Sequence, residues 1–325
     1  MSIRSIWPAV LLLLYMAAAG LCQDTPDAAV QSVPLHRIEV GTPEDLQSLF
    51  RYAARPLPVV SAHRGGPDRE YPENCIATFE HTLAHTFAML EIDPRFTKDG
   101  AIVVHHDADL KRTTTGEGLV ADHTLDELKK LRLKDIDGRV TDFTIPTLDE
   151  VFAWARGKTI LVLDQKDVPA IDRVKEIEEH KAEAYSMLIV YSFEDAKKCH
   201  AQNPRVMMEV MIPSLEKAKE FDRTGVPWRN VVAFVGHTPP EDPALYAAIH
   251  ERGAMCIVGT SRNLDRRFTS GDATMKQLET DYRSLLKRGA DLIETDIPAP
   301  LGALLHAASD TPQVQGCRFL VKVTE

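Results

Sequence analysis

The sequence lacks the features that mark a zinc-stabilised or nucleic-acid-binding protein. Its five cysteines include no Cys-x-x-Cys pair, so the spacing of a zinc knuckle is absent. They could form one disulfide in an oxidising compartment or remain buried free thiols, and the sequence leaves both open. Basic residues are in deficit, with 38 Lys and Arg against 48 Asp and Glu. This balance argues against nucleic acid and anionic membranes as partners.

Charge is also scarce at the N-terminus, where Arg4 is the sole charged residue among the first 22. The apolar run 9–16 is followed by small residues at 17–20, which is the order of a secretory signal peptide. The run is short for a membrane span, which needs about 20 apolar residues. We therefore predict a signal peptide over residues 1–22, an exported protein and no stable membrane span after cleavage.

The signal peptide sets the expected organisation of the rest of the chain. Cys22 could be lipidated, but Leu21 is bulkier than the residue such a signal prefers, so a free exported product is favoured. Residues 23–45 are polar and indicate a leader or linker, and residues 46–325 are predicted as the folded part. Cleavage of the signal peptide removes Arg4 from the 38 basic residues and none of the 48 acidic ones, so the net charge of the mature protein becomes −11. A phosphate ester would then need a site that supplies its own positive charge.

Downstream of residue 58, short β-branched runs alternate with amphipathic stretches at the spacing of βα units. Eight strands are expected, at 59–63, 89–93, 160–164, 187–191, 206–211, 231–235, 255–258 and 291–295. Thr124 and Thr147 begin capping boxes, and the Arg-Gly-Ala turns at 252–254 and 288–290 each end a helix before a strand. This pattern predicts an α/β fold, a TIM (β/α)8 barrel.

One long segment interrupts the βα rhythm between Asp93 and the helix predicted at Thr147. It contains an extended piece at 101–105, a Gly-rich loop at 113–118 and a short helix near Thr124. We expect an insertion after the second strand. In a barrel that position opens onto the catalytic face, where long loops are usually functional.

Acidic residues recur where predicted strands end. Glu91 and Asp93 are two residues apart on a strand and so share a face. Two carboxylates inside a barrel repel each other unless a cation lies between them, and a hard divalent ion suits oxygen ligands. The alternative places both at the wet rim beside Arg95. Asp164 and Lys166 share a face in the same way and could add a third carboxylate and a phosphate-binding cation, or form an ordinary salt bridge.

Two histidines fall near the same end of the predicted barrel. His63 ends the first strand and is followed by Arg64 and two glycines, whose amides could approach a ligand. The turn at Asp99-Gly100 returns the chain so that His106 arrives near the same mouth. Phosphodiester cleavage needs a base and an acid, and two imidazoles titrate in the right range. His63 could instead be a solvated loop residue, and His105 is expected to point away.

Together these motifs resemble the glycerophosphodiester phosphodiesterase family, most strongly over residues 58–166. The motifs that carry the resemblance are His63-Arg64-Gly65, Pro72-Glu73-Asn74, Glu91-Ile92-Asp93, Asp99-Gly100, His106-Asp107, Arg112-Thr113-Thr114, Ile145-Pro146-Thr147-Leu148 and Lys166, with a weaker match at Thr295-Asp296-Ile297-Pro298. The resemblance implies a TIM barrel that hydrolyses glycerophosphodiesters, which are small-molecule substrates, to glycerol 3-phosphate and an alcohol.

The resemblance also implies roles for single residues. The family's catalytic histidines fall on His63 and His106, its metal carboxylates on Glu91, Asp93 and Asp164, and its phosphate-binding cations on Arg64 and Lys166. Glu73 and Asn74 match a motif near the metal, as substrate contacts or as its support, although Asn74 would also fit as the N-cap of a helix over 76–87. The implied cofactor is one divalent cation, Ca²⁺ or Mg²⁺.

The chain departs from the family pattern at three places. Asp164 stands where Glu is usual, Cys75 where Thr is usual, and Gly259-Thr260 where Trp-Thr is expected. Two other functions therefore stay open. One is a phospholipase of related barrel type acting on lysophospholipids or sphingolipids, and the other is a non-catalytic exported binding protein for phosphorylated headgroups. The sequence leaves the alcohol and the oligomeric state open.

Overall fold

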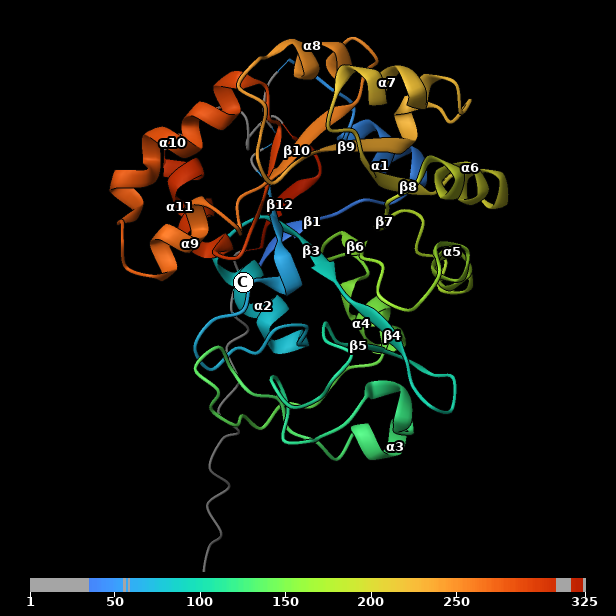
Figure 1. Ribbon diagram of the computed structural model, residues 1–325, viewed down its shortest axis with the longest axis vertical. Coiled ribbons are helices and arrows are strands. Elements are labelled where there is room, and N and C mark those ends of the chain that lie inside the picture. The colour runs from blue at the N-terminus through green and yellow to red at the C-terminus, as the bar shows by residue number, and fades with distance from the viewer. Residues whose placement is uncertain (1–34, 55–56, 58, 308–316, 324–325) are drawn as a thin grey trace, which may run out of the picture. The chain divides into compact units, whose positions relative to one another are not determined.

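Eight short apolar runs form the parallel strands of a closed barrel in the computed structural model, which describes residues 35–54, 57, 59–307 and 317–323 (Figure 1). The barrel strands are β2 (Val60–Ala62), β3 (Ala88–Ile92), β6 (Leu161–Leu163), β7 (Ser186–Val190), β8 (Met207–Met211), β9 (Val231–Gly236), β10 (Met255–Gly259) and β11 (Leu292–Thr295). They neighbour one another in chain order, and β11 closes onto β2. The predicted TIM barrel is confirmed.

Helices cover the outside of the barrel (Figure 1). They are α2 (Ile76–His85), α4 (Leu148–Ala155), α5 (Ala170–Glu179), α6 (Phe193–Gln202), α7 (Leu215–Asp222), α8 (Ala244–His250), α9 (Leu264–Thr269), α10 (Met275–Arg288) and α11 (Pro298–Ala307), with 3-10 turns η1 (His63–Gly65) and η3 (Trp228–Asn230). The predicted capping box at Thr147 starts α4, and Gly253 and Gly289 have the positive φ expected after α8 and α10.

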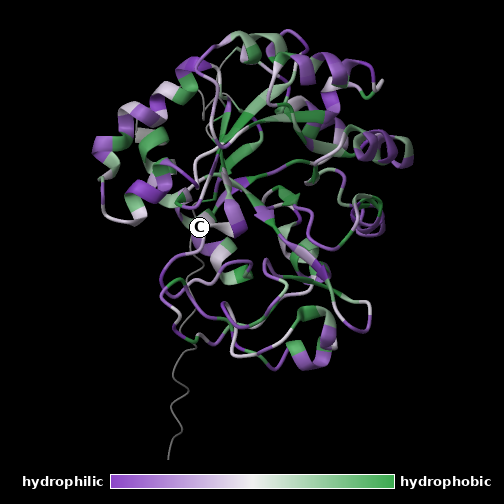
Figure 2. Cartoon of the chain, in the orientation of Figure 1, coloured by the Kyte–Doolittle hydropathy of each residue, from purple (hydrophilic) through white to green (hydrophobic). Residues whose placement is uncertain are grey.

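Strand periodicity separates two apolar cores, because successive side chains point to opposite faces of a strand. Residues such as Met89, Val162 and Met207 fill the barrel interior, whereas their neighbours Leu90 and Leu163 pack outward under the helices. Figure 2 shows the strands as the most apolar part of the fold and polar residues on the outer helices. Residues 91, 209 and 294 share the inward face, so charged side chains there enter the barrel.

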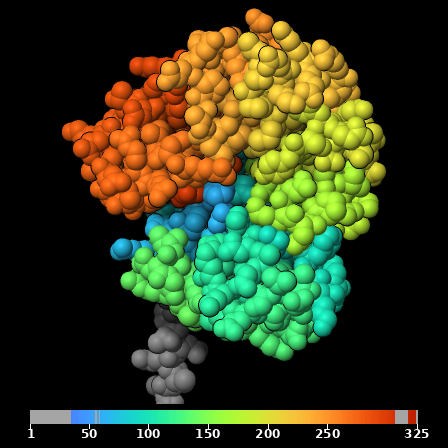
Figure 3. All heavy atoms as spheres, viewed as in Figure 1, coloured from blue at the N-terminus to red at the C-terminus, as the bar shows by residue number. Residues whose placement is uncertain are grey.

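The predicted insertion after the second barrel strand is present as a small lobe. It contains β4 (Pro94–Phe96) paired antiparallel with β5 (Ile102–Val104), the 3-10 turn η2 (Val120–Asp122) and α3 (Leu125–Leu128). The lobe has its own apolar cluster, which includes Val103, Leu110 and Leu128. Figure 3 shows it in teal and green beside the barrel, with the surface hollowed between it and the orange helices.

A strand pair from distant parts of the chain closes the amino end of the barrel. β1 (His36–Ile38) pairs antiparallel with β12 (Leu320–Lys322). The helix α1 (Pro43–Leu49) follows β1 in sequence and precedes the first barrel strand, β2. Ile38, Leu46 and Leu320 are buried in the same cluster as the barrel interior. The stretch 23–45 was predicted as a leader, but its last ten residues already contain β1 and the start of α1, because their apolar side chains cover the barrel floor.

Two other expectations concern the ends of the chain and its thiols. The predicted signal peptide at 1–22 lies outside the described residues. Among the described residues, none of the helices is both long and apolar enough to cross a membrane. The described cysteines, Cys75, Cys199, Cys256 and Cys317, are free thiols, so the alternative without a disulfide holds for these four.

Candidate active site

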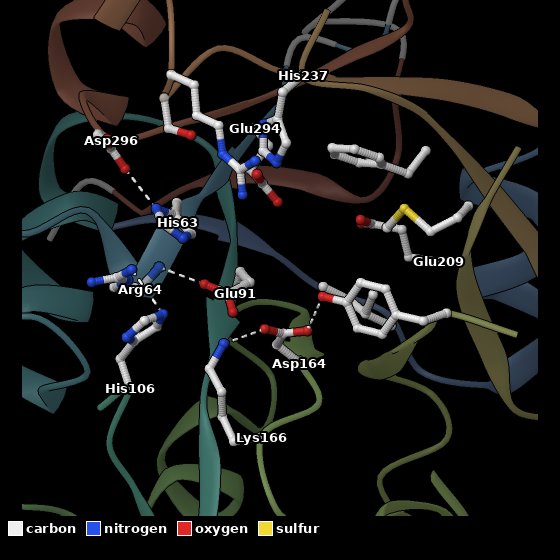
Figure 4. Close-up of a pocket in the computed structure, with 16 residues that line it drawn as sticks. His63, Arg64, Glu91, His106, Asp164, Lys166, Glu209, His237, Glu294 and Asp296 are labelled. Atoms are coloured by element: carbon white, nitrogen blue, oxygen red, sulfur yellow. Dashed lines mark hydrogen bonds and ion pairs between the residues drawn. The ribbon is translucent and has the colours of Figure 1, made fainter. Parts of the chain in front are cut away.

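A cavity of about 490 Å³ opens at the carboxyl ends of the barrel strands. It is lined by six of the nine predicted site residues, namely His63, Arg64, Glu91, His106, Asp164 and Lys166. Figure 4 shows these side chains pointing toward one another from η1, β3, the insertion and the segment after β6. Carboxyl ends of barrel strands are where (β/α)8 enzymes place their catalytic groups.

The turn η1 holds His63 and Arg64 in place after β2. Arg64 has φ 54°, and its backbone N–H donates to Glu91 Oε2 at 2.7 Å. Gly65 follows with φ 82°, and a Cβ there would lie 2.3 Å from the Phe79 ring. Only glycine fits this position, because both the backbone angle and the aromatic neighbour exclude a side chain. The His-Arg-Gly motif is thus a rigid mount for two site residues.

Three carboxylates lie together at the carboxyl ends of β3 and β6. Glu91, Asp93 and Asp164 each offer an oxygen, and these oxygens all lie within 4.8 Å of one another. The three residues are 2%, 0% and 8% exposed. The alternative of a wet rim beside Arg95 is wrong, since Arg95 bonds Asp167 instead.

The surroundings shift the pKa values of Glu91 and Asp93 in opposite directions. Burial, followed by the charges of Asp93 and Asp164, raises the pKa of Glu91 well above its ordinary range. Burial opposes ionisation of Asp93 as well, but Lys166, His106 and Asn74 together outweigh it and lower the pKa to about 2. Lys166 Nζ lies 2.9 Å from Asp93 Oδ1 and also contacts Asp164. Buried oxygen ligands carrying surplus negative charge fit a hard divalent cation.

His63 has a carboxylate partner that fixes its ring. Its Nδ1 lies 2.6 Å from Asp296 Oδ1, in the segment after β11, which leaves Nε2 toward the cavity. Burial alone would lower the pKa of His63, but Asp296 and the nearby charge of Glu294 outweigh it and raise the pKa. A protonated His63 is therefore favoured near neutral pH relative to a free imidazole.

The pKa of His106 is shifted in the opposite direction. Its Nδ1 lies 2.7 Å from Asp107 Oδ1, and Arg64 Nη2 lies 2.8 Å from its Nε2. Burial lowers its pKa despite the nearby Asp93 and Asp107. Because Arg64 can only donate, Nε2 accepts and the neutral ring is the form this contact favours. The environments of the two imidazoles thus shift their pKa values in opposite directions.

Glu73 supports this pair through a closed network of charges. Its carboxylate accepts from Arg64 at 3.1 Å and from Arg112 at 2.6 and 2.9 Å. Arg112 also donates to Asp107 at 2.5 Å, which completes the circuit to His106. Sequence reasoning quoted Asp107 and Arg112 only as parts of motifs, because their partners lie on other segments.

Asn74 is not the N-cap of the following helix. Cys75 occupies that position, without a side-chain cap, and the helix α2 ends at His85 rather than residue 87. Asn74 has φ 57°, and its amide donates to Asp93 Oδ2 at 2.6 Å while Asp93 N–H donates back at 3.2 Å. Asn74 is 2% exposed and does not line the cavity. Its position favours support of the carboxylate over substrate contact.

Several cavity residues were not predicted from the sequence. They are Tyr191, Glu209, His237, Arg262, Glu294 and Asp296. A charged residue at an inward position of a buried strand was the available signal for Glu209 and Glu294. His237 had no such signal. Its ring lies over Gly259, where a Cβ would be 2.2 Å from His237 Nδ1, so it takes the space that a side chain at 259 would need.

A second cavity of about 420 Å³ adjoins the first through His63, Arg64 and Asp296. Its outer part is lined by Ile136 of the insertion and by Phe268 and Pro298. It falls between the insertion and the helices after β10 and β11, where the surface is hollowed in Figure 3. His105, by contrast, is buried in the insertion with Nε2 2.9 Å from Thr113 Oγ1, away from both cavities as expected.

A (β/α)8 barrel with clustered acids and two oriented imidazoles at the carboxyl ends of its strands is the arrangement of a hydrolytic enzyme. The profile of the glycerophosphoryl diester phosphodiesterase family matches residues 63–279. The chain belongs to this family, whose members are phosphoric diester hydrolases.

Individual relatives agree with that assignment. The crystal structure of a glycerophosphoryl diester phosphodiesterase from Parabacteroides distasonis is 36% identical, with a TM-score of 0.80 over 89% of this chain and 100% of that one. A glycerophosphodiester phosphodiesterase from Caldanaerobacter subterraneus is 39% identical over 43% of this chain and 62% of the relative. A lysophospholipase D from Rattus norvegicus is 36% identical over 44% of this chain and 48% of the relative. The chain spans less than two thirds of these two curated relatives.

Proposed function

We propose that this protein hydrolyses glycerophosphodiesters to glycerol 3-phosphate and an alcohol, with a divalent cation and two histidines. The observation that carries the proposal is the convergence of both imidazoles, the acids Glu91 and Asp164 and the base Lys166 on one cavity. Family membership supports the reaction class. An acidic protein that binds a phosphate ester needs local positive charge at the site. In this cavity a phosphate would contact a cation and two basic side chains.

Glu91, Asp93 and Asp164 would hold one Ca²⁺ or Mg²⁺, both of which take carboxylate oxygens. When bound, the ion supplies positive charge that neutralises the phosphate oxygens. Lys166 already offsets part of the charge of Asp93 and Asp164, and Asn74 holds the Asp93 carboxylate in its orientation. The ligand set is therefore prepared by its neighbours.

The histidines divide the proton transfers according to their environments. His106, whose pKa is lowered, takes a proton from the nucleophile. The nucleophile is water, or the neighbouring glycerol hydroxyl, in which case water opens the resulting cyclic phosphate in a second step to give glycerol 3-phosphate. His63, whose pKa is raised, gives a proton to the leaving alkoxide. Arg64 contacts His106 Nε2 in this structure, so it has to turn onto the phosphate before that nitrogen can act as the base.

A lysophospholipid substrate is the second candidate, and the second cavity is the observation that favours it. Ile136, Phe268 and Pro298 give it an apolar outer part beside His63, and Ile136 is 58% exposed. An acyl chain could lie there while the phosphate occupies the first cavity. The relative named lysophospholipase D supports this candidate.

The function is tested by measuring glycerol 3-phosphate released from glycerophosphocholine, -ethanolamine and -inositol, and choline released from lysophosphatidylcholine. Assays with Ca²⁺, Mg²⁺ or a chelator test the cation. We expect His63→Ala and His106→Ala each to lower kcat by about 10²–10⁴. The exposed His85 on α2 supplies the control His85→Ala, which should retain the wild-type rate. Saturable binding of these diesters without turnover would instead support the binding protein.

We also propose that the protein is exported, on the strength of the charge-poor, apolar order of residues 1–22. N-terminal sequencing of the protein recovered from the extracytoplasmic fraction tests this proposal. A mature terminus between residues 20 and 23 is expected, whereas recovery of an intact Met1 in the cytoplasm would contradict export.

A further inference from the structure

The wall of the first cavity carries two carboxylates that the proposed reaction does not use. Glu209 projects from β8 and Glu294 from β11, both at inward positions of the barrel. They are 0% and 5% exposed. Figure 4 shows both side chains pointing into the space beside Glu91 and Asp164. Burying a carboxylate that has no partner costs free energy of folding, so the presence of these two acids calls for a physical reason.

Neither acid finds a partner within the part of the chain that the structure describes. Both carboxylate oxygens of Glu209 are buried without a hydrogen-bond partner. The Glu294 carboxylate makes no hydrogen bond or ion pair with a described residue, and His63 is the positive group that acts most strongly on its pKa. Burial and neighbouring carboxylates raise the pKa of both groups. A bound cation would remove this penalty because it supplies the missing counter-charge.

The surroundings favour an organic cation over a second metal ion. Calcium takes six to eight oxygen ligands, about twice what two carboxylates can provide. The groups of three possible metal-ligating side chains in the described residues include neither Glu209 nor Glu294. The cavity wall beside them is formed instead by Ile189, Met211 and Phe234. Carboxylates combined with an aromatic face and methylene groups match an alkylammonium ion.

The positive groups of the cavity are arranged differently. Arg64 and Lys166 are the proposed phosphate-binding cations. Both are already paired with other groups, Arg64 with Glu73 and Lys166 with Asp93. Arg262 lines the cavity as well, and its charge acts on His237. The cavity therefore offers cations for a phosphate and unpartnered carboxylates for a positive group, which is complementary to a zwitterion.

We propose that Glu209 and Glu294 form an acceptor site for an ammonium group and select glycerophosphodiesters whose alcohol is an amino alcohol. This proposal rests on the proposed function and deepens it by naming the substrate class. A cavity of about 490 Å³ lies in the size range of pockets that hold small ligands, so both ends of such a diester fit one site.

The first test separates charge from shape. Choline and its neutral isostere 3,3-dimethyl-1-butanol are titrated into the full, metal-loaded protein by calorimetry. We expect choline to bind at least tenfold more tightly than the isostere, and Glu209→Gln or Glu294→Gln to remove that preference. Equal binding of the two probes to the wild-type protein overturns the proposal.

The second test uses turnover. The ratio of kcat/KM for glycerophosphoethanolamine to that for glycerophosphoglycerol should fall at least tenfold in Glu209→Gln and in Glu294→Gln, mainly through KM. The exposed Glu220 on α7 provides the matched control Glu220→Gln, which should keep the wild-type ratio. If Glu209→Gln does not fold, Glu294→Gln and the choline titration decide. An unchanged ratio in a folded variant overturns the proposal.

The outcomes distinguish this proposal from the proposed function. Choline binding that depends on Glu209, in a protein that cleaves no diester, would support the acceptor site and reject the reaction. Diester cleavage with no preference for charged alcohols would keep the reaction and reject the acceptor site. A second equivalent of Mg²⁺ or Ca²⁺ that is lost in Glu209→Gln would also reject it, because a metal ion would then be the cation.

Discussion

Asp296 shows how a single residue can set the chemistry of another that lies 233 positions away. Its carboxylate fixes the ring orientation of His63 and opposes the effect of burial on that imidazole. Asp107 does the same for the orientation of His106, but there burial prevails and the pKa is lowered. The two histidines have the same intrinsic chemistry, so the opposite shifts of their pKa values arise from neighbours and burial alone.

Asp296→Asn is expected to shift the pH profile as well as the rate. The carboxylate raises the pKa of His63, and an acid catalyst is active below its pKa. Losing the negative charge lowers that pKa, so the basic limb of kcat/KM against pH should move to lower pH. The profile of Asp172→Asn, a change at a half-buried residue on α5 that pairs with Lys175, serves as the control. A lower rate with the basic limb in its original place would show that His63 is not the acid.

Sequence reasoning succeeded where the determinants of a site residue are local. His63, His106 and the Glu-x-Asp pair could be placed because strand periodicity and strand ends fix their direction. For Asn74 the family motif indicated a place near the metal carboxylates, where it bonds Asp93, and only the alternative of a helix N-cap was wrong. Sequence reasoning gave no role to Glu209 and Glu294, because an inward position can be predicted but the lack of a partner depends on every other strand of the barrel.

At the scale of elements, η1 and the insertion complete a site that the barrel alone would leave unfinished. η1 supplies His63 and Arg64, and the segment after β5 supplies His106 and Asp107. The β4–β5 hairpin is anchored to the barrel loops, since Arg95 and the backbone N–H of Phe96 both bond Asp167. The insertion was predictable from its length, but its contact with the loop after β6 was not.

The mount formed by η1 can be tested with a pair of glycine substitutions. Gly65 and Gly253 have nearly equal φ, 82° and 84°, but only Gly65 has an aromatic ring in the way of a Cβ. Gly253→Ala should show the backbone cost, and Gly65→Ala should lose roughly 1–3 kcal/mol more through overpacking against Phe79. Urea unfolding measures both. Equal losses in the two variants would mean that the contact with Phe79 is not a constraint.

At the scale of the whole molecule, the acids of the cavity are a source of instability that a bound cation would relieve. Glu91, Asp93 and Asp164 are buried together, and Lys166 is their basic partner. Anything that binds the folded state and not the unfolded chain stabilises the fold by mass action. The proposed metal site should therefore be visible in unfolding experiments, independently of activity.

Adding Ca²⁺ or Mg²⁺ to metal-free protein should raise Tm, with about 2.7 kcal/mol of added stability at one hundred times Kd. Asp164→Asn removes one of the three clustered carboxylates and should reduce the shift. Potassium chloride at matched ionic strength is the control for screening. Thermal scans of wild type and variant provide the measurement, and a wild-type Tm that responds to neither divalent ion would contradict the metal site.

The pairing of β1 with β12 has a consequence for how the chain is made. Because β12 follows the last barrel strand in sequence, a nascent chain that has formed β1 holds an unsatisfied strand edge until all eight barrel strands have been synthesised. Until then Ile38 and the interior methionines lack the cover that Leu320 completes. The floor of the barrel is thus completed only after all eight barrel strands have been made, although the first residues of that floor precede the barrel in sequence.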